Sequence, residues 1–192
     1  MKTTKKTKMI TLTISLAIIG SIIIGLFTKV TIEVTQEIKI NKSSEEVWEV
    51  MGNQFTQVHL WSTNFKESKA GGNPKLAQLD YLHRVTLTER GKTVQEMDAY
   101  DAQNHSLSYH ITEGLPKIAK LAKAVWSLDS ISKEQTTANF LFIMETNGLI
   151  GTLLKPVFTK KITQSAAEIA EDLKHYVEHN TPHPRKVASQ NK

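Results

Sequence analysis

Histidines and carboxylates are the side chains that could do chemistry in this 192-residue chain, because cysteine is absent. Without cysteine, neither a disulfide nor a thiolate metal site can form. His175 and His179 stand four residues apart, a spacing that can bring two imidazoles to one metal ion on a helix. The residue after His175 is a tyrosine, so the H-E-x-x-H pattern of zinc hydrolases is not met. We therefore expect a solvent-exposed pair and no metal site.

Glu96 and Asp98 are two residues apart, so they share one face of a strand with Val94 and Tyr100. If that face points inward, the apolar surroundings would raise the pKa of a carboxyl group, as a general base requires. If it points outward, the carboxylates form an ordinary solvated surface. Glu96 is thus the one weak candidate for a catalytic residue. The chain has no nucleophile motif, phosphate-binding loop or dinucleotide fingerprint, and we expect no cofactor.

The charge distribution excludes one class of partner. The chain has 24 basic and 19 acidic residues, but five lysines lie within the first 29 residues, which contain no acid. The rest of the chain is therefore balanced in charge. A nucleic-acid-binding domain needs a basic surface, so we expect no nucleic-acid partner.

Residues 9–28 form an uncharged run between Lys8 and Lys29. A helix of this length is about 30 Å long, which matches the hydrocarbon core of a bilayer. The alternative is a cleaved secretory signal, whose apolar region is usually shorter and ends at a small-x-small site. We favour an uncleaved single-pass anchor in the cell membrane. The lysines before it place the N-terminus in the cytoplasm and the domain on the outer side, periplasmic or extracellular. If the segment is cleaved, the domain is secreted.

The next part of the chain predicts a strand, two short helices and an antiparallel sheet. Residues 30–40 alternate apolar and polar side chains, as a half-buried strand does. Ser43 and Glu46 have the spacing of a capping box that begins a helix, and Gly52-Asn53 interrupts that helix. The segment 66–79 reads as a long loop. Further strands, separated by turn residues, are predicted at 81–89, 93–101, 105–114, 123–131 and 136–146.

The C-terminal part predicts one long helix. Apolar residues recur at spacings of three and four over 149–179, and Pro156 lies near the start, where a helix tolerates it best. We expect this helix to pack on the sheet and residues 181–192 to form a disordered tail. The domains are thus 1–29 (basic N-terminus and anchor), 30–180 (folded domain) and 181–192 (tail). The helix residues expected to face the sheet are Val157, Ile162, Ala166, Ile169 and Leu173.

Four stretches, taken in this order of elements, carry a family resemblance. They are SSEEVWEVM (43–51), VQEMDAYDAQNHSLSYHI (94–111), GLIGTLLKPVFTKKI (148–162) and AEDLKHYVE (170–178). The chain resembles the START-like, or SRPBCC, superfamily, and within it the polyketide cyclase/dehydrase and lipid-transport group. The likeness covers about residues 30 to 180.

The resemblance implies an α+β helix-grip fold, like that of the birch-pollen allergen. A curved antiparallel sheet of about seven strands would wrap around the long C-terminal helix and enclose a hydrophobic cavity. We predict a mostly apolar pocket of a few hundred Å³. Alternatively, its aromatic residues simply fill the core. The candidate lining residues are Trp48, Phe55, Trp61, Tyr109, Trp126 and Phe142.

These observations predict a membrane-anchored, non-catalytic domain that binds a hydrophobic small molecule or lipid in an internal cavity. Two alternatives stay open at this point. One is a polyketide cyclase/aromatase-like enzyme, and the other is a protein–protein interaction domain. The sequence identifies no protein partner.

Overall fold

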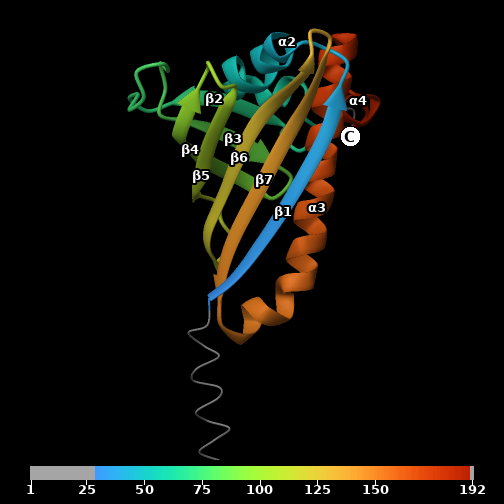
Figure 1. The fold of residues 1–192 in the computed structure, drawn as a ribbon. Coiled ribbons are helices and arrows are strands. Elements are labelled where there is room, and N and C mark those ends of the chain that lie inside the picture. Colours follow the sequence, from blue (N-terminus) through green and yellow to red (C-terminus); the bar gives the residue numbers. More distant parts are fainter. Residues whose placement is uncertain (1–28, 191–192) are drawn as a thin grey trace, which may run out of the picture.

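The computed structural model describes residues 29–190, and these form one seven-stranded antiparallel sheet packed on a long helix (Figure 1). The strand order is β1-β7-β6-β5-β4-β3-β2. The strands are β1 (Lys29–Ile40), β2 (Glu67–Gly71), β3 (His83–Thr88), β4 (Gly91–Asp101), β5 (Ser106–Glu113), β6 (Ala119–Ser132) and β7 (Gln135–Asn147). The helices are α2 (Ser44–Trp48), η1 (Glu49–Asn53), η2 (Phe55–Leu60), α3 (Gly148–His179) and α4 (Pro184–Gln190). The predicted α+β helix-grip architecture is confirmed.

Strand β2 corrects the prediction of a loop over 66–79. It pairs antiparallel with β3 at the free edge of the sheet, with Lys69 opposite Val85. None of its five residues is buried, so the segment lacks the alternation that marks a half-buried strand. Charged side chains on such an edge strand also protect the sheet from pairing with another chain.

The first helix is interrupted at Gly52, where the Trp48 ring packs against the backbone. Ser43 and Glu46 form the predicted capping box, which begins α2. At Gly52, in the π-helical turn η1, an added Cβ would lie 2.4 Å from Cε2 of the Trp48 ring. The indole therefore lies directly on the backbone at Gly52. The chain then continues into the short 3₁₀ helix η2.

Helix α3 packs on the concave face of the sheet through Ala166, Ile169 and Leu173, which are buried as predicted. Ile162 is half-buried. The prediction was wrong for Val157, whose side chain is 47% exposed. Pro156 lies inside the helix, where its ring removes a main-chain hydrogen bond and favours a bend. The turns that precede it lie beyond the end of the sheet (Figure 1).

The prediction of a disordered tail at 181–192 was wrong. Helix α4 occupies most of that range and packs onto the domain. Lys186 is buried and its Nζ donates a hydrogen bond to the carbonyl of Phe65 at 2.6 Å. Arg185 donates to Oδ1 of the buried Asp172 through Nη2 at 2.8 Å and through Nε at 3.2 Å. These contacts reach far along the chain, which local apolar periodicity does not reveal.

The anchor predicted over residues 9–28 lies outside the described residues. Within 29–190, no helix combines the length and the apolar content that crossing a bilayer requires. Lys29, the first described residue, pairs with Asn147, which directly precedes α3. The domain therefore begins at the end of the sheet where α3 starts.

Candidate ligand-binding site

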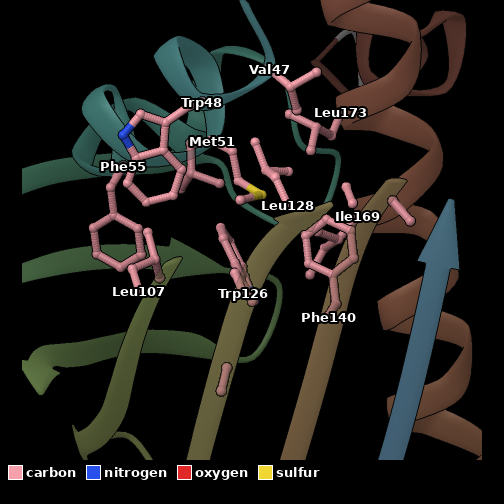
Figure 2. Packing of buried hydrophobic residues seen from close by; sticks show 14 of the residues in the cluster. Val47, Trp48, Met51, Phe55, Leu107, Trp126, Leu128, Phe140, Ile169 and Leu173 are labelled. Carbon is pink, nitrogen blue, oxygen red and sulfur yellow. The ribbon is translucent and has the colours of Figure 1, made fainter. Parts of the chain in front are cut away.

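Aromatic rings from η2 and three neighbouring strands meet on the concave face of the sheet. The Phe55 ring centroid lies 5.3 Å from that of Tyr109 and 5.9 Å from that of Trp126. Tyr109 and Trp126 are 5.6 Å apart, and Phe140 lies 5.4 Å from Trp126. Figure 2 shows Phe55, Trp126 and Phe140 between the helices and the sheet. These separations are those of rings in contact.

The other predicted lining residues, Trp48, Trp61 and Phe142, differ in how deeply they are buried. Trp48 is buried against Tyr100 and His105, with both ring centroids at 5.4 Å. Trp61 is buried within the same cluster. Phe142 is only half-buried, although its side chain is on the same face of β7 as the buried Phe140. A ligand-binding role for all six candidates stays a prediction.

A second, more open apolar region lies between the sheet and the first half of α3. Its buried members are Ile32, Val34, Met144 and Ala166. The half-buried members that pack against them are Ala119, Phe142, Phe158 and Ile162. On the adjacent strand β6, the small residues Ala122 and Ala124 stand opposite Met144 and Phe142. Apolar side chains on the concave face are thus partly accessible toward the start of α3.

Arg84 on β3 is the residue that sequence reasoning missed. Its side chain is 0% exposed, which is rare for arginine. Nε donates to Oε1 of Gln95 at 2.5 Å, and Nη1 donates to the carbonyl of Phe55 at 2.8 Å. Nη2 has no hydrogen-bond partner among the described residues. One feature of the sequence pointed to its burial. Arg84 and Thr86 are two residues apart in a strand, so their side chains lie on the same face of β3.

The Arg84 guanidinium sits in an aromatic cage. Its central carbon lies 3.7 Å from the centroid of Phe55, and 5.1 to 5.3 Å from those of Phe65, Tyr109 and Trp126. The negative faces of aromatic rings attract a cation at such distances. Burial lowers the pKa of Arg84 to about 10, so the group stays charged at neutral pH. No carboxylate within residues 29–190 forms an ion pair with it.

Further unpartnered polar atoms belong to the same buried cluster. Oη of Tyr81 and Nε1 of Trp61 and Trp126 make no hydrogen bond to any described residue. Burial raises the pKa of Tyr81, so its hydroxyl keeps its proton at neutral pH and can donate. The interior near Arg84 therefore has unused donors and a positive charge.

Glu96 lies on the face of β4 that points away from the core. Its carboxylate is therefore not in the apolar surroundings that a general base with a raised pKa requires. Its carboxylate pairs with Nζ of Lys75 at 2.7 Å, and this hydrogen bond lowers the pKa of Glu96. Gln95 and Met97 occupy the buried face instead. The register shifts between Met97 and Ala99, and this irregularity separates Tyr100 from the face of Glu96.

The histidine pair does not form a metal site with its surroundings. His175 and His179 stack with ring centroids 4.5 Å apart, and His183 lies 5.0 Å from His175. Across the described part of the chain, no group of three or more histidine or carboxylate side chains has an arrangement that could hold a metal ion.

A pocket of about 570 Å³ is present on the surface, but its character differs from the predicted chamber. It lies beside the turn between β6 and β7 and the start of α2. Polar and charged residues line it, namely Asn41, Lys42, Glu46, Ser132, Glu134 and Gln135. None of the six aromatic candidates takes part, so this is not the chamber that the sequence predicted.

The fold is similar to several solved structures at low sequence identity. XoxI from Bacillus cereus is 12% identical, with a TM-score of 0.64 over 79% of this chain and 99% of that protein. A START superfamily protein from Mycobacterium smegmatis is 13% identical, with a TM-score of 0.60 over 78% and 99%. The Zhui aromatase/cyclase from Streptomyces sp. R1128 is 11% identical, with a TM-score of 0.57 over 80% and 100%. These likenesses show the fold.

Among curated proteins, none matches the sequence. The profile of one protein family does match it, over residues 31–178, which is nearly the whole of the described domain. On the strength of that match, this chain belongs to the polyketide cyclase/dehydrase and lipid transport family.

Proposed function

We propose that this protein is a membrane-anchored, non-catalytic binding protein that holds an apolar small molecule or lipid between its sheet and α3. The observation that carries the proposal is the partial exposure of Phe142, Phe158 and Ile162, which pack toward the apolar interior. Apolar surface in contact with water costs about 25 cal/mol per Å². An apolar ligand that covers this surface would therefore bind favourably.

The aromatic cluster would form the closed end of this site. Phe55, Tyr109 and Trp126 already contact one another, and Phe142 packs against both this cluster and the open region. A ligand entering near the start of α3 would pass Met144 before it reached Phe142. Trp48 and Trp61 support the closed end from the side of η1 and η2.

A catalytic function has less support. A proton transfer needs an acid or base beside the bound ligand. Glu96, the one candidate, pairs with Lys75 on the other face of the sheet. The likeness to an aromatase/cyclase is at 11% identity and extends to the fold alone. Glu96→Gln should therefore leave ligand binding unchanged.

The membrane position is part of the proposal. Residues 9–28 would span the bilayer, with the N-terminus in the cytoplasm and the domain on the outer side, because four lysines precede this run. The chain lacks cysteine, so Ile131→Cys would give a single reactive thiol at an exposed position. A membrane-impermeant maleimide should label it in intact cells. Labelling only after lysis would contradict the orientation.

Native mass spectrometry of the full-length protein from mild detergent tests the ligand proposal, together with analysis of extracted lipids. We expect an apolar molecule to be retained. Ala122→Phe should lower its occupancy, because Ala122 stands opposite Met144 in the open region. Lys123→Phe places the same side chain on the other face of β6 and should not lower it. If neither extraction nor an added fluorescent apolar probe reveals a ligand, the proposal is wrong.

A further inference from the structure

Arg84 carries a buried charge that no carboxylate of the described residues balances. We propose that Arg84 binds the carboxylate of the ligand, so that the natural ligand is an apolar carboxylic acid. This inference rests on the proposed function and names the chemical class of its ligand. The acid would lie at the closed end of the site, and its apolar part would extend toward Phe142.

The hydrogen bonds of Arg84 leave N–H donors of its guanidinium free to bind a ligand. A guanidinium has five N–H donors in one plane. Two of them reach Gln95 and the carbonyl of Phe55, which fixes the plane of the group. Nη2 makes no hydrogen bond to any described residue, so its two donors are free for a ligand. A carboxylate oxygen accepts hydrogen bonds from such N–H groups, and hydrogen bonds between two charged partners are stronger than those between neutral groups.

The surroundings favour an anion over a neutral polar group. An unpaired buried charge is costly, and the aromatic cage offsets only part of this cost. The unpartnered atoms of Tyr81 and Trp126 belong to groups that can donate, as an anion requires. An ester or alcohol could accept a hydrogen bond but would leave the charge of Arg84 unbalanced.

Access to Arg84 requires side chains to move. Trp126 and Phe140 are in contact on the adjacent strands β6 and β7, beyond Phe142. A ligand that reaches Arg84 from the open region must displace these rings. Binding should therefore change the fluorescence of Trp126, which lies 5.3 Å from the guanidinium by ring centroid.

The test compares palmitic acid with methyl palmitate as competitors of a fluorescent apolar probe on full-length protein in detergent. We expect the acid to bind about 10- to 100-fold more tightly than the ester, the usual range for a hydrogen bond to a charged group. Arg84→Met should remove this preference and leave ester binding unchanged. Arg84→Lys should keep part of it, because the charge remains.

The outcomes separate this inference from the proposed function. Equal affinity of acid and ester in the wild-type protein would overturn the role of Arg84 and leave an apolar binding protein. Failure of both to bind would overturn the proposed function. Competition by acetate as strong as that by palmitic acid would show a site for free small anions, and would overturn the ligand class. The wild-type comparison needs no variant, so it stands even if a substitution prevents folding.

A different part of the molecule carries a second inference. Helix α3 begins with an exposed apolar face, on which Leu153 is 75% exposed. Leu149, Ile150, Leu154 and Val157 are also exposed. Positions 150, 153, 154 and 157 follow the spacing of one helix face. An exposed apolar patch of this kind marks a contact with another molecule.

The charge around this face indicates which molecule. Lys155, Lys160 and Lys161 are exposed on the same half of α3. No acidic residue occurs between Glu145 and Glu168. Apolar side chains flanked by lysines are typical of a helix that lies in the interface of an anionic bilayer.

The position of the exposed apolar face of α3 in the fold agrees with contact to a bilayer. Lys29, the first described residue, pairs with Asn147 directly before α3, so β1 begins at the end of the sheet where α3 starts (Figure 1). The expected anchor at 9–28 precedes Lys29 in the sequence. We infer that the apolar face of α3 inserts into the surface of an anionic lipid bilayer. The half-buried region at Phe142 and Phe158 would then open near the lipid, which offers a route for an apolar ligand.

The experiment uses the full-length protein in nanodiscs of phosphatidylcholine and phosphatidylglycerol at 3:1. Leu153→Cys and the control Ile131→Cys, at the far end of β6, are each labelled with an environment-sensitive fluorophore. We expect lipids that carry a quencher to reduce the emission at position 153 at least severalfold more than at 131.

Three results would count against this arrangement. Equal quenching at both positions would overturn it, as would free access of an aqueous quencher to position 153. Energy transfer between labels at position 153, without quenching by lipid, would assign the face to a second copy of the chain. Incorporation of the protein into the discs separately tests the anchor at 9–28.

Discussion

Arg84 and Phe55 are joined by two different interactions. The guanidinium carbon lies 3.7 Å from the centroid of the Phe55 ring, and Nη1 donates to the Phe55 carbonyl at 2.8 Å. The first contact uses the side chain and the second uses the backbone. Together they hold η2 over β3, so the helix that follows the break at Gly52 is tied to the sheet.

Removing the Phe55 ring should therefore destabilise the domain strongly. Phe55→Ala is expected to lower the free energy of unfolding by about 3 to 5 kcal/mol, because it leaves a cavity beside a buried charge. Urea unfolding followed by circular dichroism measures this. Leu60→Ala, in the same helix at a residue that is 41% exposed, should cost less than about 1 kcal/mol. Equal losses would show that η2 is not anchored by the ring.

Arg84→Met should behave differently from a usual core substitution. A buried charge without a carboxylate partner costs free energy, and removing it offsets the loss of the two hydrogen bonds to Gln95 and the Phe55 carbonyl. We expect the free energy of unfolding of the ligand-free protein to stay within about 1 kcal/mol of the wild type or to rise. A loss of about 3 kcal/mol or more would show that Arg84 is mainly a structural residue.

Gly52→Ala should destabilise the domain through Trp48 alone. The new methyl group would lie 2.4 Å from the indole, so the ring must move. Overpacking of this kind costs about 1 to 3 kcal/mol. In a Trp48→Leu background the same change should be neutral, because the indole is absent. Thermal unfolding of the four proteins gives the coupling energy, and a coupling near zero would contradict the contact.

The buried face of α3 can be tested with two matched substitutions. Ile169→Asp places a carboxylate against the sheet and should lower the free energy of unfolding by several kcal/mol. Val157→Asp, at a residue that is 47% exposed, should change it by less than about 0.5 kcal/mol. Chemical denaturation measures both. A stable Ile169→Asp protein would mean that another face of α3 packs on the sheet.

Stability should fall in mild acid because of His175. Burial lowers its pKa, and His179 and His183 add to this effect, whereas Asp172 and Glu178 oppose it. The folded state then binds fewer protons than the unfolded state, whose histidine pKa is about 6.5. This contribution to stability is complete above about pH 6.5 and is lost as the pH falls toward the lower pKa of the folded state.

His175→Gln should therefore reduce the pH dependence of stability between about pH 7.5 and 5.5, and His59, whose pKa burial also lowers, should account for part of the remainder. Unfolding midpoints in urea, measured across this range for both proteins, provide the test. At pH 8 the two proteins should show no further change with pH. A parallel decline of both curves in acid would place the sensitivity on other groups.

Much of the fold could be predicted from local patterns. The alternation in residues 30–40 predicted β1, and the spacing of apolar residues after Asn147 predicted α3. The capping box at Ser43 was visible because its two partners are three residues apart. Such features depend on neighbours in sequence, so periodicity and spacing reveal them directly.

Only the tertiary structure decided which of these residues meet and which face they take. The register shift after Met97 separated Tyr100 from Glu96, and Val157 proved to be exposed although it continues the apolar spacing of α3. Arg84 became a candidate because its partners come from η2 and β4, far from it in the chain. The sequence by itself determined most of the elements and their order, β2 and α4 excepted, because these follow from local side-chain patterns. Burial, charge pairing and the position of α4 depend on contacts between distant residues, and local patterns do not encode those contacts.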